Sequence, residues 1–134
     1  FKAQHWYSWV LITCPIVELQ DTERAYLHAK NACQIDPDDM NAHCVLGVVE
    51  YRRGKVPIAQ EILKQTLKSA NNDVFPISSY TLAMIEHQQG HRAEAERYFQ
   101  QAVKWREEYP SPPVQVIWMH EKAAKLLGIK TAQH

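Results

Sequence analysis

Small residues and glycines recur in this 134-residue chain at a nearly constant interval. Five pairs are 36 positions apart: Leu46/Leu82, Gly47/Ala83, Gly54/Gly90, Ala59/Ala95 and Leu63/Phe99. Three earlier pairs are 34 positions apart: Ile12/Leu46, Ala25/Ala59 and Ala29/Leu63. Helical-hairpin repeats have periods of about 33 to 47 residues, because two antiparallel helices must bury their apolar stripe against the next unit. The interval therefore predicts a stack of such hairpins.

The recurring residues have distinct places in each hairpin. Gly47 and Ala83 are predicted where the first helix of a hairpin crosses the second closely, so that a large side chain would separate them. The alanines at 25, 59 and 95 take the reciprocal place on the second helix. Gly54 and Gly90 are predicted to end the first helices, where a left-handed residue is favourable.

Helix start and stop signals agree with this division. Pro57 and Pro76 suit first turns, where a missing N–H is harmless, and apolar residues in Arg92–Glu108 follow a helical stripe. The sequence predicts an all-α fold of about seven helices in one domain, residues 1–134. Its parts are repeat 1 (about 6–39), repeat 2 (about 40–73), repeat 3 (about 76–109) and a capping helix (about 114–127) that ends at Gly128.

The register of these residues resembles the tetratricopeptide repeat over roughly residues 6 to 109. The resemblance is carried by Leu46-Gly47, Gly54, Ala59 and Leu63, and by their equivalents 36 positions later. Glu50 and Glu86 depart from it, since a tyrosine usually stands there. The resemblance implies a right-handed α-solenoid that binds a protein or peptide on the concave face of the first helices.

The concave-face residues implied by the resemblance come from repeats 2 and 3. They include tyrosine, methionine and smaller apolar side chains with one arginine, which suits an apolar or helical partner. The alternative is that several of them pack against neighbouring helices and leave a small or filled groove. The implied residues are Asn41, Cys44, Val45, Val48, Tyr51, Arg52, Ile77, Tyr80, Thr81, Met84, His87 and Gln88.

A narrower resemblance concerns the ends of the sequence. The segment 9–15, the start of the helix at Asp21 and the closing segment 121–128 are similar to C-terminal repeat domains of large planctomycete-type bacterial proteins. Those domains are appended to protein kinases or WD40 arrays. This resemblance implies a module of a larger bacterial protein, and a sequence that begins at Phe1 agrees with an excised piece. Three cysteines form an odd set that does not suit a disulfide framework, so we expect a reducing, cytoplasmic compartment.

Composition and spacing argue against other kinds of function. Fifteen basic residues balance fifteen acidic ones, so a nucleic-acid or membrane surface is not expected. The cysteines at 14, 33 and 44 lack the spacing of a zinc site. His87 and His91 are four apart but separated by Gly90, and neighbouring His43 and Cys44 point in different directions on a helix. We therefore expect no metal, cofactor or catalytic residue.

The second hypothesis is self-association through the end of the stack. Phe1, Trp6 and Tyr7 cluster ahead of the first complete hairpin, and exposed aromatics of this kind could drive contact between copies. At the other end, Lys122 and Lys125 suggest a solvent-facing cap.

Overall fold

The computed structural model describes residues 22–69, 74–108 and 114–129. Within these ranges the protein forms six helices and no strand: α2 (Thr22–Ile35), α3 (Met40–Arg52), α4 (Val56–Ser69), α5 (Val74–Gln88), α6 (Arg92–Glu108) and α7 (Val114–Leu127). The all-helical prediction is thus confirmed for the described residues. The first of the seven predicted helices falls in residues 1–21, outside them, and the handedness of the stack stays a prediction.

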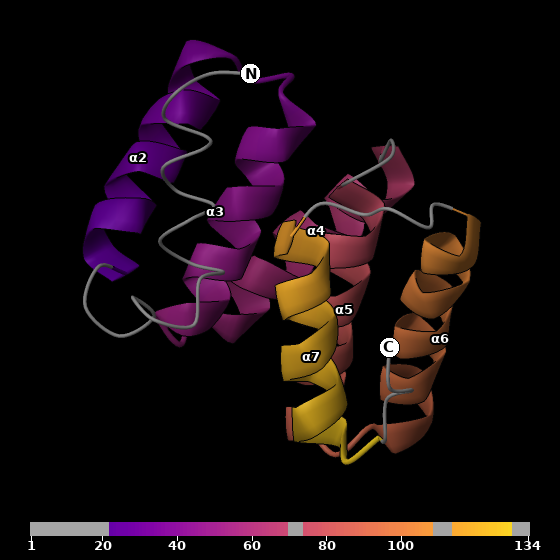
Figure 1. Cartoon of the computed structure of the whole chain (residues 1–134). Coiled ribbons are helices and arrows are strands. Elements are labelled where there is room, and N and C mark those ends of the chain that lie inside the picture. Colours follow the sequence, from indigo (N-terminus) through magenta and orange to yellow (C-terminus); the bar gives the residue numbers. More distant parts are fainter. Residues whose placement is uncertain (1–21, 70–73, 109–113, 130–134) are drawn as a thin grey trace.

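The helices pack as neighbouring pairs along the sequence (Figure 1). The most extensive contacts join α3 to α4 and α5 to α6, and α2 contacts α3 while α4 contacts α5. The last helix behaves differently, since α7 packs mainly on α5 and only slightly on α6. As a result α5 lies at the centre of the molecule, in contact with α3, α4, α6 and α7.

Three helices end in the same way, at a glycine in the left-handed region. The φ angles are 82° at Gly54, 84° at Gly90 and 73° at Gly128. In each case the amide of the residue after the glycine donates to the carbonyl four positions before that glycine, at 2.9, 2.8 and 2.9 Å. This is the Schellman motif, which satisfies carbonyls at a helix end and turns the backbone sharply. The predicted helix ends at Gly54 and Gly90 are therefore confirmed, and α7 ends in the same way.

The small residues lie where the paired helices approach most closely. A methyl group added to Gly47 would lie 2.8 Å from both Cγ and Cδ2 of Leu63 on α4. Ala59 on α4 and its equivalents Ala25 and Ala95 are fully buried. The repeat interval predicted small residues where two helices of a hairpin cross. The short distance between the paired helices is the physical reason that small residues stand there.

Buried polar groups within this core are satisfied by one another. Ser78 Oγ lies 2.7 Å from Thr66 Oγ1 and 3.2 Å from Cys44 Sγ, and the Thr66 hydroxyl also donates to the Leu63 carbonyl at 2.8 Å. The cluster connects α3, α4 and α5. Hydroxyls are buried without a large energetic cost only when they have such partners, so the cluster helps to fix the register between these helices.

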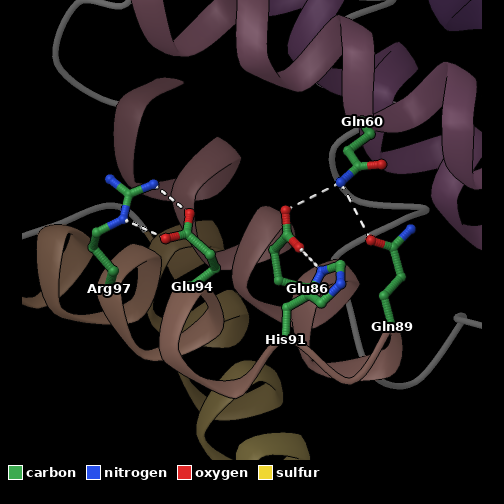
Figure 2. Close-up of polar contacts among 6 residues, drawn as sticks. All are labelled: Gln60, Glu86, Gln89, His91, Glu94 and Arg97. Carbon is green, nitrogen blue, oxygen red and sulfur yellow. Dashed lines mark hydrogen bonds and ion pairs between the residues drawn. The ribbon is translucent and has the colours of Figure 1, made fainter.

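Glu86, one of the two departures from the family pattern, ties α5 to the preceding α4. Its side chain is buried, and Gln60 on α4 donates to its Oε2 at 3.1 Å (Figure 2). Its other oxygen lies 2.7 Å from His91 Nδ1 in the turn after α5. A carboxylate that makes polar contacts therefore stands here in place of the usual tyrosine.

Glu50, the equivalent residue one unit earlier, makes its contact through an arginine. It lies 2.7 Å from Arg53 Nη1, and Arg53 reaches Glu23 on α2 at 3.0 Å. The guanidinium also stacks 3.7 Å from the centre of the Tyr26 ring on α2. Glu86 thus bonds the preceding α4 directly, whereas Glu50 is linked to α2 only through Arg53.

Candidate functional site

The twelve residues predicted for the concave face divide into two groups. The buried group packs in the core and consists of Cys44, Val45, Val48, Ile77, Tyr80, Thr81 and Met84. The other group is half-buried or exposed and consists of Asn41, Tyr51, Arg52, His87 and Gln88. The alternative left open above, packing against neighbouring helices, therefore describes much of the set.

Some of the predicted residues nevertheless line an open groove between α3, α5 and α7. Its volume is about 570 Å³, within the range of about 300 to 1,000 Å³ usual for ligand sites. Five of the twelve predicted residues line it, and α7 supplies four more. The lining residues are Val48, Tyr51, Arg52, Met84, Gln88, Met119, Lys122, Lys125 and Leu126.

The lining residues stand at the same few sequence distances before the glycines that end their helices. Each of the nine stands two, three, six or nine positions before Gly54, Gly90 or Gly128. Six positions before these glycines, for example, stand Val48, Met84 and Lys122. These are positions that the family resemblance assigns to the concave face, so α7 presents the same face as α3 and α5.

The four α7 residues were absent from the sequence prediction because 114–127 was interpreted as a cap with solvent-facing lysines. Gly128 is the signal that could have found them. It ends α7 as Gly54 and Gly90 end α3 and α5, so the same counting applied to α7 selects Met119, Lys122, Lys125 and Leu126.

The charge of the groove differs from that of the whole protein. Arg52, Lys122 and Lys125 contribute three basic side chains, and none of the nine described lining residues is acidic. The full sequence is balanced, with fifteen basic and fifteen acidic residues. The groove is therefore locally basic, with an apolar lining from Val48, Met84 and Met119.

Tyr51 and Gln88 connect α3 and α5 beside the groove. The Tyr51 hydroxyl donates to Gln88 Oε1 at 2.9 Å. Burial raises the pKa of Tyr51, and the bond to Gln88 and the charge of Arg52 oppose this shift. The phenol is therefore a neutral donor at physiological pH, and its ring offers a rigid apolar surface to an occupant.

A cluster of rings holds α7 against α5 and α6. The Tyr80 hydroxyl lies 2.7 Å from His120 Nδ1, and the two rings meet edge to face with centroids 5.2 Å apart. Phe99 on α6 lies 5.2 Å from the His120 ring and 5.4 Å from that of Tyr80. Burial raises the pKa of Tyr80 to about 12, while Arg106 opposes the shift. Tyr80 thus positions the helix that supplies four of the nine lining residues.

A cysteine–histidine pair occurs elsewhere, with a partner that the sequence did not indicate. His43 Nδ1 lies 3.7 Å from Cys33 Sγ on α2, and His43 Nε2 donates to the Pro37 carbonyl at 2.6 Å. Burial, with a contribution from Asp39, raises the pKa of Cys33 to about 11. This shift is away from the thiolate form that nucleophilic catalysis needs.

Cys44, His87 and His91 are the other residues that the sequence offers as candidates for catalysis or metal binding. Burial raises the pKa of Cys44 to about 12, opposed by its bond with Ser78. His87 lies in α5, whereas His91 lies beyond Gly90 and contacts Glu86. In residues 22–69, 74–108 and 114–129, no three His, Cys, Asp or Glu side chains gather in a way that could hold a metal ion.

A second hollow, of about 280 Å³, lies between the start of α5 and the end of α6. Phe75 and Trp105 give it an apolar lining, completed by Gln101, Lys104 and Glu108. It is smaller than the groove.

The comparison with protein families agrees with the geometry of the third hairpin. Residues 80–109 match the model of the tetratricopeptide repeat. The matched segment runs from Tyr80 on α5 through Gly90 and the whole of α6. It supports the tetratricopeptide-repeat family predicted from the residue interval. No curated protein and no solved structure matches the sequence.

Tetratricopeptide repeats are typically non-enzymatic modules that mediate contacts between proteins, since stacked hairpins create extended concave surfaces. The described helices include none that is long and apolar enough to cross a bilayer. Phe1, Trp6 and Tyr7 lie outside the described residues, so self-association through the N-terminal end stays a prediction.

Proposed function

We propose that this protein is a non-enzymatic interaction module that binds a peptide segment of its partner in the groove between α3, α5 and α7. The observation that carries the proposal is the common register of the groove. Nine residues from three helices stand at repeat positions that the family resemblance assigns to the concave face, and together they line one open hollow of about 570 Å³.

The energetics of the groove favour a preformed site. Its apolar lining rests on α3, α5 and α7, whose buried side chains belong to one core. A surface held in this way loses little conformational entropy when a partner binds, so a short contact can suffice. Tyr51, Met84 and Met119 are residue types that contribute strongly to interfaces or adapt to varied side chains.

We also propose that the module acts within a larger bacterial protein in the cytoplasm and assists its parent by recruiting other proteins. The support is the sequence similarity of residues 9–15 and 121–128 to appended repeat domains. The right-handed solenoid of three hairpins, with repeats at about 6–39, 40–73 and 76–109, belongs to the same proposal.

Selection of displayed peptides tests the binding function. A random library of twelve-residue peptides is selected on the wild-type protein, and recovered peptides are measured on Gln88→Trp, which fills the groove from its rim. Gln100→Trp is the matched control, because Gln100 is also an exposed helical glutamine but lies on α6 outside the groove.

We expect recovered peptides to lose most of their affinity for Gln88→Trp and to keep it for Gln100→Trp. Circular dichroism and thermal melts establish that both variants fold. Peptides that bind both variants as well as wild type, or a selection that enriches nothing, would contradict the proposed function.

A further inference from the structure

On the basis of the proposed function, we infer that the groove selects segments in which a large apolar side chain lies beside a carboxylate. The carboxylate belongs to Asp, to Glu or to the C-terminus of the partner polypeptide. This partner chemistry comes from the α7 face of the groove, which the sequence-based view of an apolar surface with one arginine did not include.

The basic side chains are distributed on both sides of the groove. Arg52 lies at the end of α3, whereas Lys122 and Lys125 lie one turn apart on α7. Residues three apart on a helix share a face, so the two lysines act on the same volume. Three cations that border one volume favour a carboxylate there, and a basic segment would be repelled.

The apolar lining determines the other half of the specificity. Val48, Met84 and Met119 are nearly buried, with 2, 5 and 2% of their surface exposed, and each still borders the groove. Leu126 is 37% exposed at its edge. A leucine- or phenylalanine-sized side chain would cover these surfaces and exclude water, which strengthens a neighbouring ion pair. A purely acidic tail would leave the apolar lining wet.

The position of the lysines distinguishes this groove from one that binds acids alone. In repeats 2 and 3 the inner concave positions hold Val45, Ile77 and Thr81, all of them buried. No basic residue stands at these positions, so the cations flank the apolar surface from Arg52 at the end of α3 and from Lys122 and Lys125 in the second half of α7. The expected ligand therefore has an apolar anchor with its charge to one side.

Charge reversal on α7 tests this inference. A peptide recovered by the library selection is labelled with fluorescein, and its Kd is measured by anisotropy on a Lys122→Glu/Lys125→Glu double variant. Lys64→Glu is the control, because Lys64 is exposed on α4 and does not line the groove.

We expect groove-dependent peptides to be enriched in Asp or Glu within a few residues of a large apolar side chain. The double variant should bind them at least about tenfold more weakly, since one exposed ion pair contributes up to about fivefold. Lys64→Glu should change Kd by less than about twofold. Raising the salt concentration should weaken wild-type binding, and it should not weaken binding to the double variant, because there salt screens a repulsion between glutamates and the peptide carboxylate.

The outcomes separate the two proposals. If groove-dependent peptides lack acidic residues, or if the double variant binds them like wild type, the inference fails while the binding function stands. Acidic peptides without apolar residues that bind equally well, or a single-stranded oligonucleotide that displaces the peptide, would also overturn the inference. If no recovered peptide depends on Gln88, the proposed function itself fails.

Discussion

Gly47 lies where α3 crosses α4, and the space beside it is already filled by Leu63. An added methyl group would lie 2.8 Å from two carbon atoms of that fully buried side chain. Overpacking of a core costs about 1 to 3 kcal/mol, whereas alanine is a better helix former than glycine by about 1 kcal/mol. We therefore predict that Gly47→Ala lowers the free energy of unfolding by about 1 kcal/mol, measured by urea denaturation.

A double-mutant cycle with Leu63→Ala isolates the steric origin of this loss. Without the Leu63 side chain the contact disappears, so Gly47→Ala should become neutral or stabilising in that background. Ala83 occupies the equivalent position 36 residues later. A stabilising effect of Gly47→Ala in the wild-type protein would contradict the close approach of α3 and α4.

Residue-scale prediction from the sequence was strongest for glycines and alanines. Their roles depend on steric exclusion and on φ, which are properties of the residue itself. It was weaker for Tyr80 and Thr81, which the concave register included although both are fully buried. Burial depends on where α7 lies, and α7 covers α5 at Tyr80 through His120. Tyr80 is accordingly a poor site for testing partner binding, because its removal would open the core.

At the scale of elements, the attachment of α7 to α5 determines whether the groove is complete. The Tyr80–His120 bond is partly buried and joins the centres of the two helices. Loss of one such bond costs about 1 kcal/mol, which corresponds to about fivefold in an opening equilibrium. We predict that Tyr80→Phe raises the amide exchange rates of residues 116–127 about fivefold and leaves those of α3 and α4 nearly unchanged.

Tyr51→Phe is the matched control for this experiment. It removes a hydroxyl that bonds Gln88 at an exposed position, so its cost should be smaller and α7 should keep its protection. Hydrogen exchange followed by mass spectrometry measures both variants. Equal exchange of α7 in wild type and Tyr80→Phe would mean that other contacts, and not this bond, hold the helix.

The existence of α7 could be predicted from the sequence, whereas its rotation about its axis could not. Helical spacing in 114–127 predicts a buried stripe of Ile117, His120, Ala124 and Leu127. The structure buries Ala124 and Leu127 of this stripe, and it buries Val116, Met119 and Ala123 in addition. Apolar residues stand at both sets of positions, so helical periodicity allows either rotation. Packing on α5 chooses between them, and that choice directs Lys122 toward the groove.

At the scale of the whole molecule, the groove joins residues 48 to 126 into one surface. Net charge and composition could not predict its character, because a balanced total conceals three basic side chains brought together from α3 and α7. The position of a residue within its repeat was more informative than net charge or composition. It relates helices that are far apart in sequence, and it extends to any helix that ends at the same glycine motif.

The central claim, that a partner segment occupies the groove between α3, α5 and α7, is tested most directly through the methionine methyl groups. The sequence contains three methionines. Met84 and Met119 line the groove, whereas Met40 lies at the start of α3 and does not. Carbon-13 labelling of the methyl groups gives one NMR signal for each, assigned by single Met→Leu substitutions.

On titration with a peptide recovered by selection, we predict that the signals of Met84 and Met119 shift together with one Kd, while that of Met40 stays in place. A shift of Met40 alone, or binding that leaves Met84 and Met119 unmoved, would contradict the account.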